Sequence, residues 1–156
     1  MAIEEGRKAP AFTLADAGGR KVSLKDLAGK HVIVYFYPRD DTPGCTKEAC
    51  GFRDLWGDIQ KRGAVVLGIS PDGGDSHRRF AEKYRLPFTL LCDPDKKLME
   101  RYGAWGTKVM YGKKTQGVIR STVWIGPDGT VVKHWKRVAR AAEHPAQVLE
   151  ALVQGA

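Results

Sequence analysis

The chain has 156 residues, of which 42% are hydrophobic, and this is enough for the core of a single domain over residues 1–156. No stretch approaches the roughly 18 apolar residues of a membrane span, and the charged first residues lack the apolar region of a secretory signal, so we expect a cytoplasmic protein. The net charge of +8 favours non-specific contact with nucleic acid, but no motif that reads nucleic acid accompanies it.

The first half of the chain predicts two buried strands with a helix between them. Residues 31–37 and 64–70 are unbroken runs of mostly β-branched and other apolar side chains, typical of strands buried on both faces. Thr42 is a suitable N-cap, and Pro43 suits the first helical position because an N–H there would be unpaired anyway. Apolar residues then recur at helical spacing as far as Ile59. Ahead of these elements we expect a short hairpin over residues 11–24 and a brief helix that ends near Gly29.

The second half continues the alternation and then changes to a hairpin. Its expected elements are a helix over 75–84, a strand over 88–91, a short helix from Pro94 to Tyr102, a hairpin of strands 121–125 and 130–135, and a last helix over 145–153. The lysine-containing stretch 112–117 is interpreted as a solvated loop. This order predicts an α/β fold with a central mixed sheet flanked by helices and an N-terminal β-hairpin, which is compatible with a thioredoxin-like fold.

Cys45 is placed where a thiol becomes reactive. It falls in the first turn of the predicted helix, directly after a strand, where unpaired N–H groups and the positive end of the helix dipole stabilise a thiolate. The alternative is a buried cysteine on the apolar stripe of Ala49 and Phe52. Position alone does not separate the two interpretations.

Cys50 lies five residues further along the same helix. That spacing gives about 140° of rotation and roughly 7.5 Å of rise, so the two Cα atoms are about 8–9 Å apart. A disulfide needs them within about 7 Å, so these thiols can join only if the first turns unwind. Gly44, Gly51 and Gly57 would ease that unwinding. Cys50 is also off the apolar stripe, which suits an accessible resolving thiol better than a core position.

The segment Pro38-x-x-x-Thr42-x-x-Cys45 resembles the active-site signature of peroxiredoxins. With Cys50 and the downstream Arg120-Ser-Thr, the chain resembles the PrxQ, or bacterioferritin comigratory protein, branch of that family over nearly its whole length. The resemblance implies a peroxidase that reduces hydrogen peroxide and alkyl hydroperoxides, works as a monomer, needs no cofactor or metal, and is recycled by thioredoxin or a similar dithiol.

The resemblance also implies a role for each matching residue. Cys45 would attack the peroxide, Thr42 would hold its oxygens, Arg120 would stabilise the thiolate and the leaving oxygen, Pro38 would exclude water, and Cys50 would close a disulfide with Cys45. Plainer roles compete with three of these. Thr42 could be only an N-cap, Arg120 an ordinary surface arginine and Pro38 the end of a strand.

The third cysteine, Cys92, is interpreted as structural, because it follows a buried strand and does not match the second-cysteine position of the branch. The four histidines show no metal-ligand spacing. Two other functions stay open: a general thiol–disulfide oxidoreductase on the same fold, which a Cys-x-x-Cys pair would favour, and a basic nucleic-acid-binding module.

Overall fold

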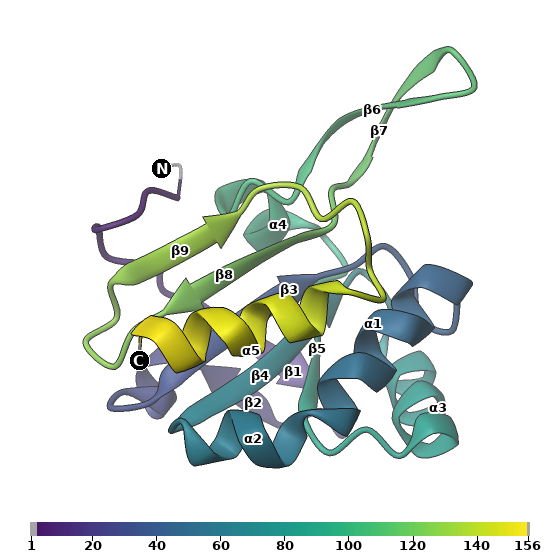
Figure 1. Ribbon diagram of the computed structural model, residues 1–156. Coiled ribbons are helices and arrows are strands. Elements are labelled where there is room, and N and C mark those ends of the chain that lie inside the picture. Colours follow the sequence, from purple (N-terminus) through teal and green to yellow (C-terminus); the bar gives the residue numbers. More distant parts are fainter. Residues whose placement is uncertain (1–2, 156) are drawn as a thin grey trace.

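The structure, a computed structural model that describes residues 3–155, is built on a mixed seven-stranded sheet in the order β2-β1-β5-β4-β3-β8-β9 (Figure 1). A separate pair, β6 and β7, forms a second sheet. The strands are β1 (Thr13–Asp16), β2 (Lys21–Ser23), β3 (His31–Phe36), β4 (Ala64–Ser70), β5 (Thr89–Cys92), β6 (Trp105–Met110), β7 (Lys113–Val118), β8 (Ser121–Ile125) and β9 (Val131–Trp135). This is the expected thioredoxin-like α/β arrangement, including the N-terminal strand pair.

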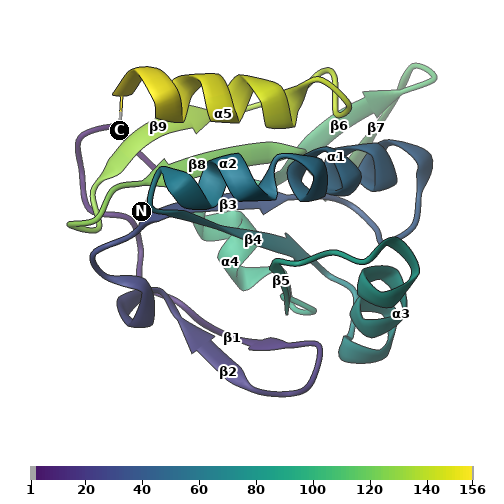
Figure 2. The same ribbon diagram turned by 60° about the horizontal axis from the view of Figure 1, so that its bottom comes forward.

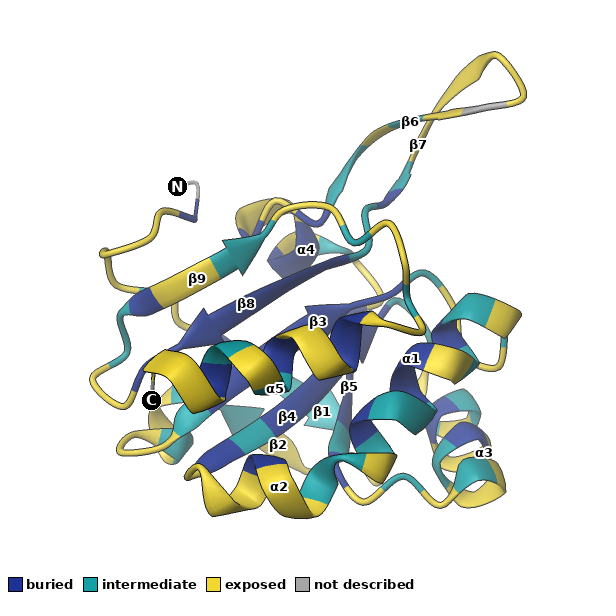
Figure 3. Cartoon of the chain, in the orientation of Figure 1, coloured by how far each residue is buried: buried dark blue, intermediate teal, exposed yellow. Residues whose placement is uncertain are grey.

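The centre of the sheet is its most buried part. β3, β4 and β5 run parallel, and the sheet continues with antiparallel strands on both sides. β3 and β4 are buried almost throughout, as their unbroken apolar runs predict for strands covered on both faces (Figure 3). Parallel neighbouring strands cannot be joined by a tight turn, so crossover connections that contain helices link them.

Helices cover both faces of this sheet (Figure 2). On one face, α1, α2 and α5 and part of α3 pack over Tyr35 of β3, and the helices contribute side chains such as Phe52 and Val148 to this core. On the other face, α4 packs on Val34 and Leu67. The helices are η1 (Leu24–Leu27), α1 (Pro43–Asp54), α2 (Trp56–Lys61), α3 (Gly74–Tyr84), α4 (Lys97–Arg101) and α5 (His144–Gly155).

The helix expected from Thr42 to Ile59 is in fact two helices. α1 ends at Asp54, and α2 begins at Trp56 after the non-helical Leu55, so a single helix there was wrong. The apolar spacing survives the break, because Phe52 and Ile59 are both fully buried. Both helices therefore still lie on the sheet.

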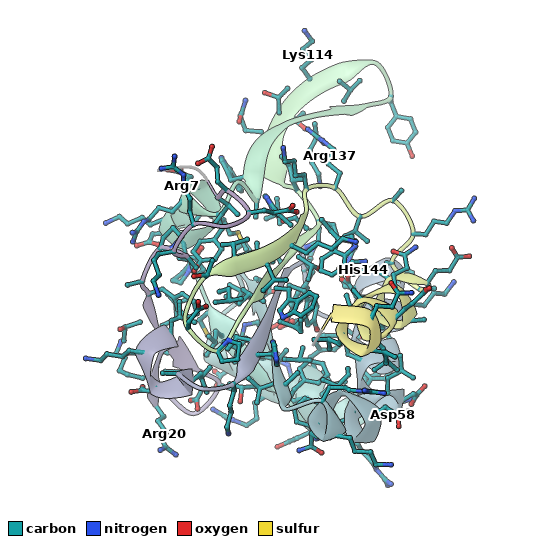
Figure 4. The ribbon with its side chains drawn as sticks, turned by 60° about the vertical axis from the view of Figure 1, so that its left-hand side comes forward. Arg7, Arg20, Asp58, Lys114, Arg137 and His144 are labelled. Atoms are coloured by element: carbon teal, nitrogen blue, oxygen red, sulfur yellow. The ribbon has the colours of Figure 1, made fainter. Side chains whose placement is uncertain are left out.

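The interpretation of residues 112–117 as a loop was wrong, because most of this stretch belongs to β7. β6 and β7 form a hairpin that extends away from the body, and Lys114 projects from its outer part (Figures 1 and 4). Tyr111 and Gly112 make its turn with positive φ angles of 53° and 76°, as tight hairpin turns require. The first four residues of β7 are exposed, so the segment lacks the apolar alternation that identifies a strand from sequence.

Candidate active site

The pairing of β3 with β8 brings two distant segments of the chain to one end of the sheet. Phe36, the last residue of β3, pairs with Ser121, the first residue of the antiparallel β8. The loop that leaves β3, which contains Pro38 and Thr42, therefore starts beside Arg120, the residue before β8. The residues of the sequence motif thus meet at one place in the fold.

Cys45 lies in the first turn of α1 and is 1% exposed. Its Sγ atom is 3.2 Å from Nη2 of Arg120, which donates a hydrogen bond to it. A guanidinium at this distance, together with the N-terminal end of α1, places positive charge beside the sulfur. The Cys45 thiol therefore lies in an electropositive environment, which distinguishes it from an inert cysteine in an apolar core.

Arg120 is shared between Cys45 and a buried carboxyl group. Its Nη1 atom donates to Oε1 of Glu48 at 2.7 Å, and the Glu48 side chain is fully buried. Burial raises the pKa of Glu48 from 4.5 to about 7, although the charge and hydrogen bond of Arg120 lower it. Burial also lowers the pKa of Arg120, but the negative charges of Glu48 and Cys45 outweigh this effect and leave the net shift upward. Arg120 therefore stays charged.

Glu48 was missed by the sequence analysis. It lies three residues after Cys45 on the same helix face, and Oε2 has no hydrogen-bond partner among the described residues. A charged residue aligned with an apolar stripe is the signal that could have identified it, because such a residue is normally exposed unless it has a partner.

Thr42 is the N-cap residue of α1, as expected, with extended φ and ψ angles of −98° and 157°. Its hydroxyl makes no capping hydrogen bond and instead donates to the carbonyl oxygen of Arg39 at 3.0 Å. The hydroxyl oxygen keeps its acceptor capacity for a further partner. Pro38 follows two residues after β3 and is half-buried.

The other two cysteines differ in their surroundings. Cys50 is half-buried on α1, and both it and Cys45 are free thiols, as an intact helix requires. Cys92 lies at the end of β5, where burial and then the negative charges of Asp40, Asp16 and Asp72 raise its pKa. A thiol that stays protonated is a poor nucleophile, which agrees with a structural role for Cys92.

An open cleft of about 530 Å³ gives access to this region. Gly44 and Arg120 line it from the site, and Lys47 and residues 139–143 form the rest of its wall. The backbone N–H of Val138 donates to the carbonyl oxygen of Arg120 at 2.8 Å, which holds this wall against the site. The cleft therefore opens beside Arg120, whose Nη2 atom contacts Cys45.

Two other kinds of feature are absent from residues 3–155. In this part of the chain, no cluster of three or more His, Cys, Asp or Glu side chains is arranged to hold a metal ion. None of the helices in these residues has the length and apolar character needed to cross a membrane.

Comparison with known proteins identifies the family. Residues 6–134 match the AhpC/TSA family. A putative peroxiredoxin bcp from Coxiella burnetii is 52% identical over 149 residues, which are 96% of this chain and 98% of that protein. Peroxiredoxin Bcp of Bacillus subtilis is 43% identical over 152 residues, covering 97% and 96% of the two chains.

Solved structures give the same result for the fold. Peroxiredoxin Q of Xanthomonas campestris superposes with a TM-score of 0.89 at 37% identity, over 97% of this chain and 98% of that one. Peroxidoxin BcpB of Mycobacterium tuberculosis superposes with a TM-score of 0.86 at 31% identity, over 99% of each chain. The chain therefore belongs to the AhpC/TSA family, in its PrxQ or Bcp branch of peroxiredoxins, and is a thiol-dependent peroxidase.

Proposed function

We propose that Cys45 is the peroxidatic cysteine and that Cys50 is the thiol that resolves it. The observation that supports this assignment best is the 3.2 Å contact between Cys45 Sγ and Nη2 of Arg120. Cys45 combines that contact with a position in the first turn of α1, whereas the pKa of Cys92 is raised by burial and by acidic neighbours. Of these two thiols, Cys45 is the better nucleophile.

In the first step, the Cys45 thiolate attacks one oxygen of the peroxide. An S–O bond forms, the O–O bond breaks, and the leaving oxygen takes up a proton. Hydrogen peroxide then yields water, an organic hydroperoxide yields an alcohol, and Cys45 is oxidised to a sulfenic acid. Negative charge moves from sulfur to the leaving oxygen, so the fixed charge of Arg120 stabilises the transition state.

Thr42 and Pro38 complete the proposed site. The Thr42 hydroxyl donates to the Arg39 carbonyl, so its oxygen is free to accept a hydrogen bond from the peroxide O–H. Such a bond would orient the O–O bond for attack by sulfur. Pro38, which has no N–H and is half-buried, limits the access of water.

In the second step, the Cys50 thiolate attacks the oxidised sulfur of Cys45. An S–S bond forms, and the sulfenic oxygen leaves as water after protonation. Because both residues lie on α1, the first turns of the helix must unwind before the sulfurs can meet. A dithiol then reduces the disulfide by exchange and is itself oxidised to a disulfide.

The substrates and the reductant are proposed more broadly. Alkyl peroxide reduction activity is described for the bacterioferritin comigratory protein of Xanthomonas campestris, and we extend it here to hydrogen peroxide and organic hydroperoxides. Thioredoxin is the proposed reductant. We further propose that residues 1–156 act as one domain, since β1 to β9 share one sheet apart from the β6–β7 hairpin. We propose in addition that the protein is a monomer and works in the cytoplasm. Sedimentation equilibrium would test the monomer.

The decisive experiment is peroxide-dependent NADPH oxidation coupled through thioredoxin and its reductase. We expect Cys45→Ser to abolish turnover, Cys50→Ser to block recycling after one oxidation, and Cys92→Ser to behave like the wild type. An active Cys45→Ser protein would refute the proposal. If Cys92→Ser failed and Cys50→Ser cycled, the resolving thiol would be Cys92.

The same proteins separate the two alternative functions. A general thiol–disulfide oxidoreductase would exchange with disulfides faster than it reacts with peroxide. A nucleic-acid-binding module would show affinity that falls steeply with salt and is indifferent to Cys45→Ser.

A further inference from the structure

A buried polar cluster lies next to the active-site loop, outside the proposed chemistry. Its centre is the carboxylate of Asp40, two residues before Thr42, with a side chain only 3% exposed. Oδ1 accepts a hydrogen bond from the Tyr37 hydroxyl at 2.6 Å. Oδ2 accepts one from Ser76 at 2.8 Å and lies 2.7 Å from Nδ1 of His77. Both oxygens of this buried carboxylate are therefore satisfied.

His77 connects this carboxylate to the sheet. Its side chain is fully buried, and Nε2 lies 2.9 Å from the carbonyl oxygen of Leu91 in β5. A carbonyl oxygen only accepts hydrogen bonds, so Nε2 must carry a proton. The other ring nitrogen, Nδ1, makes the contact with Asp40. His77 thus bridges the loop and β5 with both ring nitrogens.

Three separate segments hold the loop at this one residue. Tyr37 comes directly after β3, and Ser76 and His77 belong to α3. The backbone N–H of Asp40 donates to Oδ2 of Asp72, in the segment after β4, at 2.7 Å. The next residue on the loop, Asp41, contacts α3 as well, but in a part-exposed ion pair with Lys83 at 2.8 Å. The inner contacts are therefore the ones shielded from solvent.

We propose that His77 is a positioning residue for Cys45 that acts through Asp40. The bridge fixes the part of the loop that precedes Thr42, so that Thr42 and the first turn of α1 stand in the geometry needed for attack on the peroxide. The residues that must unwind to reach Cys50 begin after this anchor, at Pro43. The bridge therefore supports the oxidation step and is not broken in the resolution step.

This inference rests on the proposed role of Cys45, and it differs from a role in stability alone. A buried ionic or neutral Asp–His pair need not stabilise a fold, because desolvation offsets much of the attraction. Loss of a purely structural pair would alter all steps together. Loss of a positioning pair slows oxidation of Cys45 and leaves closure of the disulfide unchanged, since the bridge is not broken when the helix unwinds.

Two variants test which contact matters. In His77→Asn, the side-chain amide replaces Nδ1 and keeps the hydrogen bond to Asp40. In His77→Gln, it replaces Nε2, keeps the bond to Leu91 and loses the one to Asp40. We expect His77→Gln to slow oxidation of Cys45 by about 10-fold to 100-fold, as small misplacements of a reacting group do. We expect His77→Asn to stay within about threefold of the wild type.

Rapid mixing with peroxide, with mass spectrometry of quenched samples, gives the rates of sulfenic acid formation and of disulfide closure. The same samples give the fraction of Cys45 over-oxidised to sulfinic acid, which we expect to fall in His77→Gln because the reaction of the sulfenic acid with a second peroxide needs the same geometry, whereas closure does not. This fraction compares two fates of one sulfenic acid, so it does not depend on how much of the protein is folded. Lys83→Met, which removes the ion pair with Asp41 and leaves the hydrogen bond from the Tyr84 hydroxyl, serves as the control and should match the wild type.

The inference is overturned if His77→Gln oxidises at the wild-type rate, if the two variants are slowed equally, or if closure slows in step with oxidation. It is equally overturned if Lys83→Met reproduces the effect of His77→Gln. The proposed function fails in a different way, through activity that persists in Cys45→Ser. The two failures are therefore distinguishable with one set of proteins.

Discussion

Cys45 Sγ and Nη2 of Arg120 lie 3.2 Å apart, although 75 positions separate the two residues in the sequence. The contact arises from the antiparallel pairing of β3 and β8, which places the start of one strand beside the end of the other. Arg120 is held from its second nitrogen by Glu48 and through its backbone by Val138. The guanidinium is therefore fixed before peroxide arrives, which is the condition for electrostatic stabilisation without reorganisation.

Replacement of Arg120 should have a graded effect on the reaction with peroxide. We expect Arg120→Met to lower the rate constant of Cys45 oxidation by about 100-fold to 1000-fold, as the loss of one fixed donor to a developing charge does. Arg120→Lys should lose less, because it keeps a positive charge but not the two-nitrogen contact. Stopped-flow kinetics with hydrogen peroxide measure both. If Arg120→Met were oxidised at the wild-type rate, the proposed role of Arg120 would be contradicted.

Gly44 should resist replacement because of the same guanidinium. A Cβ atom added there would lie 3.3 Å from Nη2 of Arg120, although Gly44 is in a helix, where alanine is intrinsically better by about 1 kcal/mol. We expect Gly44→Ala to slow Cys45 oxidation. Gly57→Ala in α2 is the matched control, because its Cβ would meet nothing within 4 Å. Oxidation kinetics and thermal unfolding of both variants separate the two effects, and equal kinetics would contradict the prediction.

Glu48 should make the protein less stable as the pH rises. The unfolded chain releases this proton near pH 4.5, whereas the folded chain keeps it until about pH 7 because the group is buried. Between these values the folded chain binds more protons, so the free energy of unfolding falls with rising pH by up to about 3 kcal/mol in all. Glu48→Gln should remove this contribution. Urea unfolding at several pH values measures it, and an unchanged pH dependence in the variant would show that Glu48 titrates normally.

His144 should have the opposite effect in a similar range of pH. Burial lowers its pKa from 6.5 to about 4, and its Nε2 atom lies 2.8 Å from the Thr122 hydroxyl. As the pH falls from 6.5 to about 4, the unfolded chain binds a proton that the folded chain does not, so the free energy of unfolding decreases. This decrease amounts to up to about 3 kcal/mol in the wild type, and His144→Gln should not show it.

The comparison of His144→Gln with Glu48→Gln tests the two assignments together. The wild type should show a shallow pH dependence between about pH 4.5 and 6.5, because the two groups offset each other there. Relative to it, the free energy of unfolding should rise more with pH in Glu48→Gln and fall more with pH in His144→Gln. If the free energy of unfolding changed with pH in the same way in both variants, the pKa shifts of Glu48 and His144 would both be excluded.

Much of the fold could be predicted from local pattern. The apolar runs at 31–37 and 64–70 form buried strands, and Thr42 is the N-cap residue of a helix that begins at Pro43, because these signals depend on burial and backbone geometry over a few residues. The β6–β7 hairpin could not be predicted in this way. Its strands pair with each other away from the sheet and leave most of β7 exposed. The sequence therefore has no alternation of apolar and polar residues there that would identify a strand.

The functional site also has some features that the sequence predicts and others that only the structure shows. By itself the sequence determined the thiol at a helix N-terminus, the five-residue spacing to Cys50 and the resemblance to peroxiredoxins, because all of these are properties of contiguous chain or of a motif. Only the tertiary structure decided that Arg120 reaches Cys45, that the buried Glu48 shares its charge, and that His77 holds Asp40 from α3. Each of these is a contact between residues far apart in the chain or a consequence of burial, and its strength depends on distance and exclusion from water, which no local pattern specifies.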